Sequence, residues 1–417
     1  MLLVGQIALP KWCSDKGFLP SQEVGRQVTA NAQPADGLAP RSPCLWPVGL
    51  FLVARLTLSG LGIALWQLGA VPTQPDSIAR PYFGVEPVVH GLSGMLLGVW
   101  QRHDTIHYLR IAAGGYSSPD LTAYYPLFPL LVRLVGVLVG GNYLLASLIV
   151  SNAAALLSIA VCYRLFSDEL GEDAARRATA YLVFFPTAFF LLVAYSESLA
   201  LLLSVFAFWS ARRGRWGIAA MAALVCPLVR VQGVAIALAL LVEVWLQAKR
   251  SIRPSLVSGL AVGAPVLGFA AYWAWRACEG FPPLTEVVWS YWRRVPALPW
   301  SGILLTIQRV FNRIAFPMEY LDLGLVLAFA VLGVLVLRRL PLSFAVYYWS
   351  VLVLNLSQIL VLEPLVGQAR YGLLLFPAFM VLGQLARRPL VNRLILYPSV
   401  ALWLFLAGAF ALWGFVG

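Results

Sequence analysis

The side chains best suited to acid–base chemistry gather between residues 71 and 141. This stretch holds every histidine of the chain and four acidic residues: Asp76, Glu86, His90, His103, Asp104, His107 and Asp120. A carboxylate can accept the proton of a hydroxyl group while that hydroxyl attacks a carbon atom, which is general-base catalysis. Two histidines four residues apart can instead hold a metal ion. The stretch is therefore the first candidate for a reactive site.

Asp104 and His107 fall on one face of a helix expected from residue 104 onward. At 100° per residue this face also holds Tyr108 and Ile111, the opposite face is mostly apolar, and a glycine pair ends the pattern. Asp104 has two interpretations, a general base facing a cavity or the N-cap of this helix. The pair His103 and His107 has the spacing of metal ligands, but without a strong third ligand the sequence favours histidines that line a polar cavity.

Two arginines stand where a guanidinium can meet a phosphate group. Arg230 lies at a turn after a proline, and Arg370 precedes a late helix in the sequence Gln368-Ala-Arg-Tyr371. Arginine pairs bidentately with phosphate and can stabilise its charge as it leaves. The alternative for each is an ordinary contact with lipid headgroups.

Other polar and aromatic positions also allow more than one interpretation. Glu197, at the tip of a hairpin, can cap the following helix or line a cavity. Tyr124 and Tyr125 stand in a proline-bounded segment whose spacing favours an interfacial aromatic belt over a functional role. Residues 289–294 mix tryptophan, tyrosine and arginine, which fits a glycan, a lipid or a plain membrane interface.

The composition indicates that membrane helices position these residues. The 417 residues are 60% hydrophobic and only 12% charged, with a mean hydropathy of +0.81. Soluble chains carry about 25% charged residues, so this chain has too little polar surface for a water-soluble fold. We expect an all-α polytopic membrane protein, since each spanning helix needs about 20 apolar residues.

The basic residues orient the expected spans. Eighteen of the 30 Lys and Arg fall in the N-terminal tail and in five clusters between apolar runs, which the positive-inside rule places in the cytoplasm. With the N-terminus inside, this predicts about eleven transmembrane helices, at residues 47–70, 143–166, 178–194, 198–211, 217–229, 234–248, 255–276, 319–337, 342–362, 371–386 and 394–416. The site candidates at 104, 197, 230 and 370 then share the extracytoplasmic side.

Three regions follow from these spans. Residues 1–46 are expected to form a disordered cytoplasmic tail. Residues 47–276 form a catalytic transmembrane core whose outer loop, 71–141, carries two helices lying on the membrane surface. Residues 277–417 form a C-terminal transmembrane part with an outer loop at 277–318.

Charge and cysteine content exclude some functions. The net charge of +12 is explained by topology, so no nucleic-acid partner is expected. The five scattered cysteines indicate neither a metal site nor a disulfide framework.

Six stretches, taken in order, resemble the PIG-V type mannosyltransferases, within the GT-C class of polyprenol-dependent glycosyltransferases. They cover residues 100–235 densely and return near 368–380. One departure is His103, where the family commonly has tryptophan before its aspartate. The stretches are R-H-D-x-x-H-Y-L-x-I-A-x-x-G-Y at 102–116, Y-Y-P-L-F-P-L-L-V-R-L at 124–134, F-P-T-A-F-F-L-L-V-A-Y-S-E-S-L at 185–199, R-R-G-R-W at 212–216, R-V-Q-G at 230–233 and Q-A-R-Y-G-L-L-L-F-P-A-F at 368–379.

The resemblance implies a GT-C-like membrane glycosyltransferase. Such enzymes transfer a sugar, usually mannose, from a polyprenyl-phosphate (dolichyl-type) carrier to a lipid-linked or other glycan acceptor on the extracytoplasmic face, with inversion. It implies Asp104 as the base or the residue that orients the acceptor, and Arg370 as a candidate ligand of the carrier phosphate. We expect no tightly bound metal or other cofactor, and the need for a divalent cation remains open. The residues expected to bind the substrates are Arg102, His103, His107, Tyr108, Tyr125, Glu197, Arg230, Arg370 and Tyr371.

Two other functions stay open from the sequence. A transporter or lipid flippase would place polar sites near the bilayer midplane between repeated halves, and no internal repeat is evident. A non-catalytic membrane scaffold is the other alternative.

Overall fold

The computed structural model describes residues 45–250 and 254–416, which are predominantly helical. The prediction of a disordered tail over residues 1–46 lies almost wholly outside the described residues, because the first helix, α1, begins at Leu45.

Six helices of the described residues are long and apolar enough to cross a membrane. The composition therefore indicates an integral membrane protein, as the sequence predicts. The six are α1 (Leu45–Gln67), α5 (Tyr143–Leu170), α9 (Ile236–Lys249) with the 3₁₀ turn η5 (Val231–Ala235) before it, α10 (Leu256–Cys278), α13 (Pro317–Arg339) and α17 (Pro389–Ala411).

The other expected spans are helices of 10 to 16 residues. The predicted helix at 178–194 ends at Val183, and the one at 342–362 ends at Leu356. The count of eleven spans therefore stays a prediction. The short helices are α6 (Glu172–Val183), α7 (Glu197–Arg212), α8 (Trp216–Val225) with η4 (Cys226–Leu228), α14 (Leu342–Leu356) and α16 (Phe376–Leu385).

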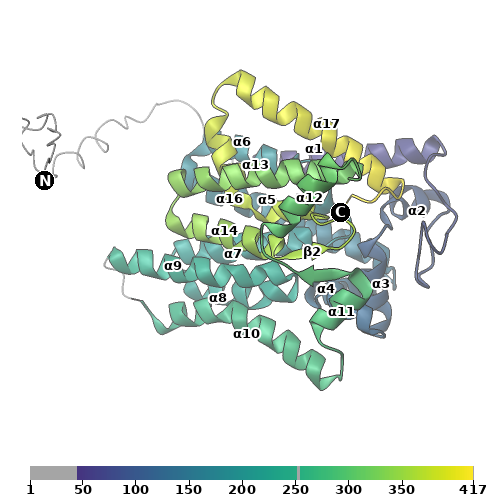
Figure 1. The fold of residues 1–417 in the computed structure, drawn as a ribbon, viewed down its shortest axis with the longest axis horizontal. Helices are drawn as coiled ribbons and strands as arrows, with labels where there is room; N and C mark the ends of the chain where they lie inside the picture. The colour runs from purple at the N-terminus through teal and green to yellow at the C-terminus, as the bar shows by residue number, and fades with distance from the viewer. Residues whose placement is uncertain (1–44, 251–253, 417) are drawn as a thin grey trace, which may run out of the picture. The chain divides into compact units, whose positions relative to one another are not determined.

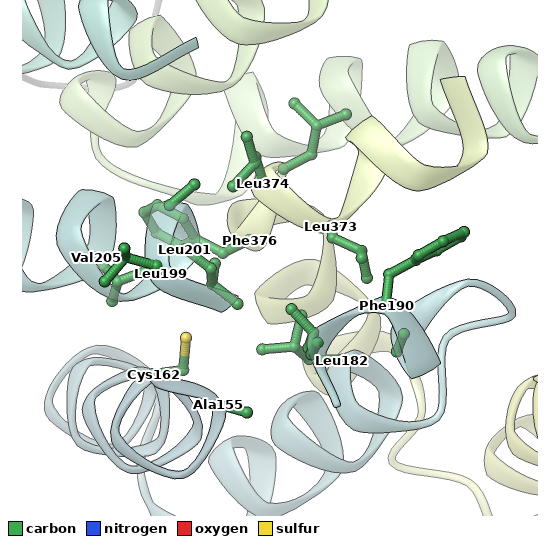
Figure 2. Packing of buried hydrophobic residues seen from close by; sticks show 14 of the residues in the cluster. Ala155, Cys162, Leu182, Phe190, Leu199, Leu201, Val205, Leu373, Leu374 and Phe376 are labelled. Atoms are coloured by element: carbon green, nitrogen blue, oxygen red, sulfur yellow. The ribbon is translucent and has the colours of Figure 1, made fainter. Parts of the chain in front are cut away.

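Helices α5, α6, α7 and α16 lie in the middle of the helical bundle. In Figure 1 these four run beside their neighbours, with α7 next to α5 and α8, and α16 next to α6 and α13. Figure 2 shows their apolar contact surface, where side chains of α5, α6 and α7 meet those that follow Arg370 in the chain. Burial of this surface holds the N-terminal and C-terminal parts of the chain together.

A buried segment without regular helix, residues 184–196, connects α6 to α7 and includes the 3₁₀ turn η3 (Ala188–Leu191). Its carbonyl groups need partners because they are removed from solvent. Asn152 and Arg55 donate to the Leu192 carbonyl at 3.0 and 3.1 Å, and Thr105 donates to Ala194 at 3.3 Å. Polar side chains from neighbouring helices therefore stabilise the non-helical backbone that leads to Glu197.

Residues 71–141 contain five short elements: α2 (Gly91–Leu96), η1 (Gly98–Trp100), α3 (Asp104–Gly114), η2 (Pro119–Ala123) and α4 (Leu127–Leu138). The predicted helix at 104–113 is confirmed as α3. Both of its faces are buried in protein, and Ile106 is fully inaccessible. Its expected position on the membrane surface stays a prediction. Helix α4 does expose an apolar side, which includes Leu134 and Leu138.

The C-terminal part adds further short elements. They include a two-stranded antiparallel pair that the all-α prediction missed, in which Arg294 is opposite Leu360. The elements are α11 (Leu284–Trp292), β1 (Arg294–Pro296), α12 (Ser301–Phe311), β2 (Gln358–Leu360), α15 (Gln368–Tyr371) and η6 (Gly372–Leu374).

Close packing of α8 against α10 gives a test of the fold. A Cβ atom at Gly268 would lie 1.9 Å from the carbonyl oxygen of Leu224, whereas one at Gly263 meets nothing within 4 Å. We expect Gly268→Ala to lower the free energy of unfolding by about 1–3 kcal/mol through overpacking. Gly263→Ala, on the same helix, should be neutral or stabilising by up to about 1 kcal/mol. Thermal unfolding in detergent measures both, and equal stability of the two variants would contradict the packing.

Candidate active site

Four charged side chains from distant parts of the chain meet in one cluster. Arg370 Nη1 lies 2.8 Å from Asp104 Oδ2, and Arg370 Nε lies 3.3 Å from Glu197 Oε1. Arg230 Nη1 lies 2.6 Å from the same Glu197 oxygen. The sequence separates Asp104 from Arg370 by 266 residues, so tertiary structure alone brings them together. We call these four residues the charged cluster.

Asp104 begins α3 on a strained backbone. His103, at the N-cap position, has φ +47° and ψ −120° and makes no side-chain cap. The interpretation of Asp104 as the N-cap is therefore wrong. Its carboxylate instead accepts from Arg370 and from the Tyr124 hydroxyl at 3.1 Å. Strain of this kind costs about 1–3 kcal/mol and is typical of functional positions.

Glu197 and Arg230 are placed by two breaks in the helical framework. Glu197 is the first residue of α7, where the buried segment 184–196 ends, and it caps no helix. The capping interpretation is therefore wrong here too. Arg230 is extended between η4 and η5 and also donates to Ser196 Oγ at 3.3 Å. A Cβ at Gly233 would lie 2.5 Å from the backbone of Cys226, so this turn needs glycine.

Arg370 is held by the backbone of its own short helix. Asp322 of α13 accepts from the Ala369 amide at 2.8 Å, and Thr187 donates to the Ala369 carbonyl at 2.9 Å. Gln368 donates to the carbonyl of Asn355 in α14 at 3.0 Å. Three separate elements therefore fix where the Arg370 side chain starts.

The two carboxylates of the charged cluster differ in access. The side chain of Asp104 is 21% exposed, whereas that of Glu197 is 1% exposed. A substrate can therefore reach Asp104 but not Glu197. This makes Glu197 a residue that positions Arg230 and Arg370.

The surroundings of Asp104 keep it ionised. Burial raises its pKa, but Arg370, followed by His107 and Arg230, outweighs this and holds the pKa below its ordinary value. Burial in turn lowers the pKa of His107, although Asp104 opposes this. At neutral pH the site therefore presents a carboxylate beside a neutral imidazole.

Tyr371 lies among three guanidinium groups. Those of Arg230, Arg370 and Arg294 lie 5.1, 5.4 and 5.8 Å from the centre of its ring. Burial raises the pKa of Tyr371, but Arg294, Arg370 and Arg230 outweigh it and lower the pKa to about 8. Arg294 has no acidic partner among the described residues at ion-pair distance, so the positive charge here exceeds what Asp104 and Glu197 neutralise.

An aromatic group adjoins Asp104. The ring of His107 stacks on Tyr124 at 5.0 Å and meets Trp292 at 5.8 Å. Tyr108 is buried behind them and shares a hydrogen bond of 2.8 Å with Ser196. Tyr125 packs on Tyr272 at 5.0 Å, beside the cluster rather than in it.

Arg102 and His103, both expected to bind substrate, face elsewhere. Arg102 is fully buried and donates to the carbonyls of Ala411 and Gly98 and to the Tyr82 hydroxyl. His103 Nε2 lies 3.3 Å from the Gly414 carbonyl. Their partners are protein groups near the C-terminus and in the first loop, so neither side chain is part of the charged cluster, and their role in substrate binding stays a prediction.

No group of three or more His, Cys, Asp or Glu side chains among the described residues is arranged to hold a metal ion. His103 and His107 contact different aromatic neighbours, Trp413 and Tyr124 respectively.

Tyr124, Tyr195 and Arg294 belong to the site although the sequence did not single them out as site residues. Tyr195 accepts from the Asp104 amide at 3.2 Å. All three stand in stretches that are aromatic or that mix aromatic residues with arginine. The composition of these stretches could have indicated the three residues as candidates, but it does not show which groups they contact.

Apolar helices that surround a partly accessible cluster of carboxylates and arginines define a membrane protein with a charged site at one end of its helices. Residues 50–329 match the family model described as mannosyltransferase (PIG-V). The chain belongs to this family, as the sequence resemblance predicts, and is a glycosyltransferase. Arg370 and Tyr371 lie beyond the matched range.

Among solved structures, the chain is similar to the crystal structure of ArnT from Cupriavidus metallidurans bound to undecaprenyl phosphate. The similarity covers 78% of this chain and 77% of that chain, with 15% identity and a TM-score of 0.46. No curated protein sequence matches the chain significantly.

The depressed pKa of Tyr371 can be measured directly. We expect the phenolate absorbance of the protein to include one titration near pH 8 that Tyr371→Phe lacks. Arg294→Gln should move this midpoint upward, because it removes the largest charge that favours the phenolate. Tyr397→Phe, which removes an exposed tyrosine of α17, controls for the loss of one phenol. Identical titrations of wild type and Tyr371→Phe near pH 8 would contradict the arrangement.

Proposed function

We propose that the protein transfers a hexose, namely mannose, from a polyprenyl-phosphate carrier to a hydroxyl group of a lipid-linked or other glycan acceptor, at the extracytoplasmic face. The observation that carries the proposal is the contact of Asp104 with Arg370. It places a base for the acceptor hydroxyl beside a cation for the donor phosphate.

Asp104 is the base in this proposal. It is the accessible carboxylate of the charged cluster and is ionised at neutral pH. In the absence of substrate Arg370 weakens it as a base. A donor phosphate that pairs with Arg370 competes for the same guanidinium, so donor binding raises the pKa of Asp104 toward the value that proton transfer requires.

Arg370, Arg230 and Arg294 are the phosphate ligands. They surround Tyr371, and their charge exceeds that of Asp104 and Glu197. As the bond between the sugar and the phosphate breaks, negative charge grows on the phosphate, and preorganised guanidinium groups stabilise it. The neutral phenol of Tyr371 can donate to the same oxygens.

Inversion is supported by the charged cluster, because Asp104 is the accessible one of its two carboxylates. A retaining mechanism needs a second carboxylate that attacks the anomeric carbon, and Glu197 is too buried to reach a substrate. Direct attack by the acceptor hydroxyl, with its proton passing to Asp104 and the polyprenyl phosphate leaving, is the remaining route. We assign no metal or other cofactor to this step, because arginines provide the positive charge.

The direction of the helices favours an extracytoplasmic site. Helix α7 starts at Glu197 and, at 1.5 Å per residue, ends about 24 Å away at Arg212. The basic clusters at Arg212 and Arg213, and at Arg338 and Arg339, end helices whose other ends lead to the site. The positive-inside rule places these basic ends in the cytoplasm. The family makes an enzyme, rather than a transporter or flippase, the supported function.

Substitution of the base tests the reaction. With radiolabelled polyprenyl-phosphate mannose and a membrane lipid extract as acceptor, Asp104→Asn should lower the rate of transfer by about 10²–10⁴-fold, because it removes the general base. Asp168→Asn, which alters an exposed ion pair with Arg213, should retain wild-type transfer. Full transfer by Asp104→Asn would remove Asp104 from its role, and no transfer by the wild type with any polyprenyl-phosphate sugar would refute the proposed function.

Cysteine labelling tests the orientation. In a variant whose native cysteines are replaced by serine, Ser117→Cys should react with a membrane-impermeant maleimide on intact cells. Arg215→Cys should react only after the membrane is permeabilised. Both positions are exposed, and they follow α3 and α7 respectively. The reverse pattern would place the site in the cytoplasm.

A further inference from the structure

A strained aromatic turn lies close to Asp104 and has no part in the mechanism above. The Val85 amide donates to the Tyr82 carbonyl at 2.9 Å, which closes a four-residue turn. Its central residues, Phe83 and Gly84, have φ of +48° and +83°, as in a type I′ turn, which favours Asn or Gly at both positions. Phenylalanine is costly in this conformation, yet the Phe83 side chain is 52% exposed.

The turn is fastened to the chain just before α3. Arg102 donates to the Tyr82 hydroxyl at 3.3 Å. Gln101 accepts from the Val88 amide at 2.8 Å and donates to the Glu86 carbonyl at 3.0 Å. These bonds fix the position of Phe83 relative to Asp104, so a ring that packing does not bury is nevertheless held in place.

Behind Phe83 a series of rings leads to the base. Phe83 lies 4.9 Å from His107, which stacks on Tyr124 at 5.0 Å. The Tyr124 hydroxyl donates to Asp104 Oδ1. We call Phe83, His107 and Trp292 the aromatic wall. The exposed ring of Phe83 is thus separated by His107 alone from Tyr124, whose hydroxyl contacts Asp104.

Hydrogen-bonding groups border the exposed ring. The guanidinium of Arg110 lies 5.6 Å from the centre of Phe83 and pairs with Asp120 at 3.3 Å. Both side chains are about one-fifth exposed, at 21% and 19%. On its other side Phe83 lines an open surface hollow with Asp76, Tyr82 and neighbouring residues of the same loop, which Arg110 and Asp120 do not line.

We propose that the aromatic wall, with Arg110 and Asp120 at its edge, is a subsite that binds a pyranose ring of the acceptor. A pyranose has an apolar C–H face that packs on an aromatic ring and a rim of hydroxyl groups that bond to a carboxylate and a guanidinium. The inference rests on the proposed function, to which it adds the position where a sugar ring of the acceptor binds.

Saturation-transfer NMR with the methyl glycosides of mannose, glucose and galactose tests the subsite in the full-length protein in detergent. At least one glycoside should receive saturation at its ring C–H protons in the wild type. Phe83→Asn should weaken this binding about tenfold, since it removes one aromatic contact. Asparagine suits the positive φ of the turn, so the variant should retain wild-type thermal stability.

Control variants separate this subsite from nonspecific contacts of the glycoside with exposed rings. Phe83→Tyr keeps the ring and should retain binding, and Phe311→Asn, at an exposed ring of α12, should not alter it. Polyprenyl-phosphate mannose should not displace the glycoside, whereas displacement would assign the wall to the donor sugar and overturn the proposal. Absence of saturation in the wild type, or unchanged binding by Phe83→Asn, would also overturn it. The transfer assay with Asp104→Asn tests the proposed function separately from this binding assay. Failure of one proposal can therefore be told from failure of the other.

Discussion

Charged side chains that are removed from water must be paired, and the structure around the candidate site depends on this constraint. Glu197 is almost fully buried, and Arg230 and Arg370 neutralise it there. A lone buried carboxylate costs several kcal/mol. Arg370 in turn pairs with both Glu197 and Asp104. One buried acid therefore obliges three distant segments of the chain to meet, and it does so without being accessible to a substrate.

The same constraint applies to the backbone. Catalytic residues on straight spanning helices would lie within the apolar part of the bundle, whereas breaks in the helices present them at an end. The break between α6 and α7 buries a run of peptide groups, and side chains such as Asn152 and Thr105 donate hydrogen bonds to them. Asn152 and Arg55, polar residues inside the spans α5 and α1, thereby support the segment that leads to Glu197.

Arg370 links the two halves of the proposed reaction. Its guanidinium binds the base in the structure and is the natural partner of the donor phosphate. Occupation of Arg370 by phosphate therefore changes the basicity of Asp104, which couples donor binding to activation of the acceptor hydroxyl. The aromatic wall extends the same site in the other direction, from Asp104 through Tyr124 and His107 to an exposed ring.

The sequence by itself determined the membrane class, the family, the helix at Asp104 and the candidates Asp104, Glu197, Arg230 and Arg370. These follow from composition, from periodicity and from motifs, which are local properties of the chain. The lengths of the spans were less predictable, because hydrophobicity alone does not show where a buried backbone leaves the helix, as it does after Val183. Tertiary structure decided which partners each charged residue has. Local spacing left both capping and chemistry open for Asp104 and Glu197, and only their contacts with Arg370 and Arg230 distinguished them. The physical reason is that pairing energies and burial depend on groups hundreds of residues away, and no local pattern of the sequence records those distances.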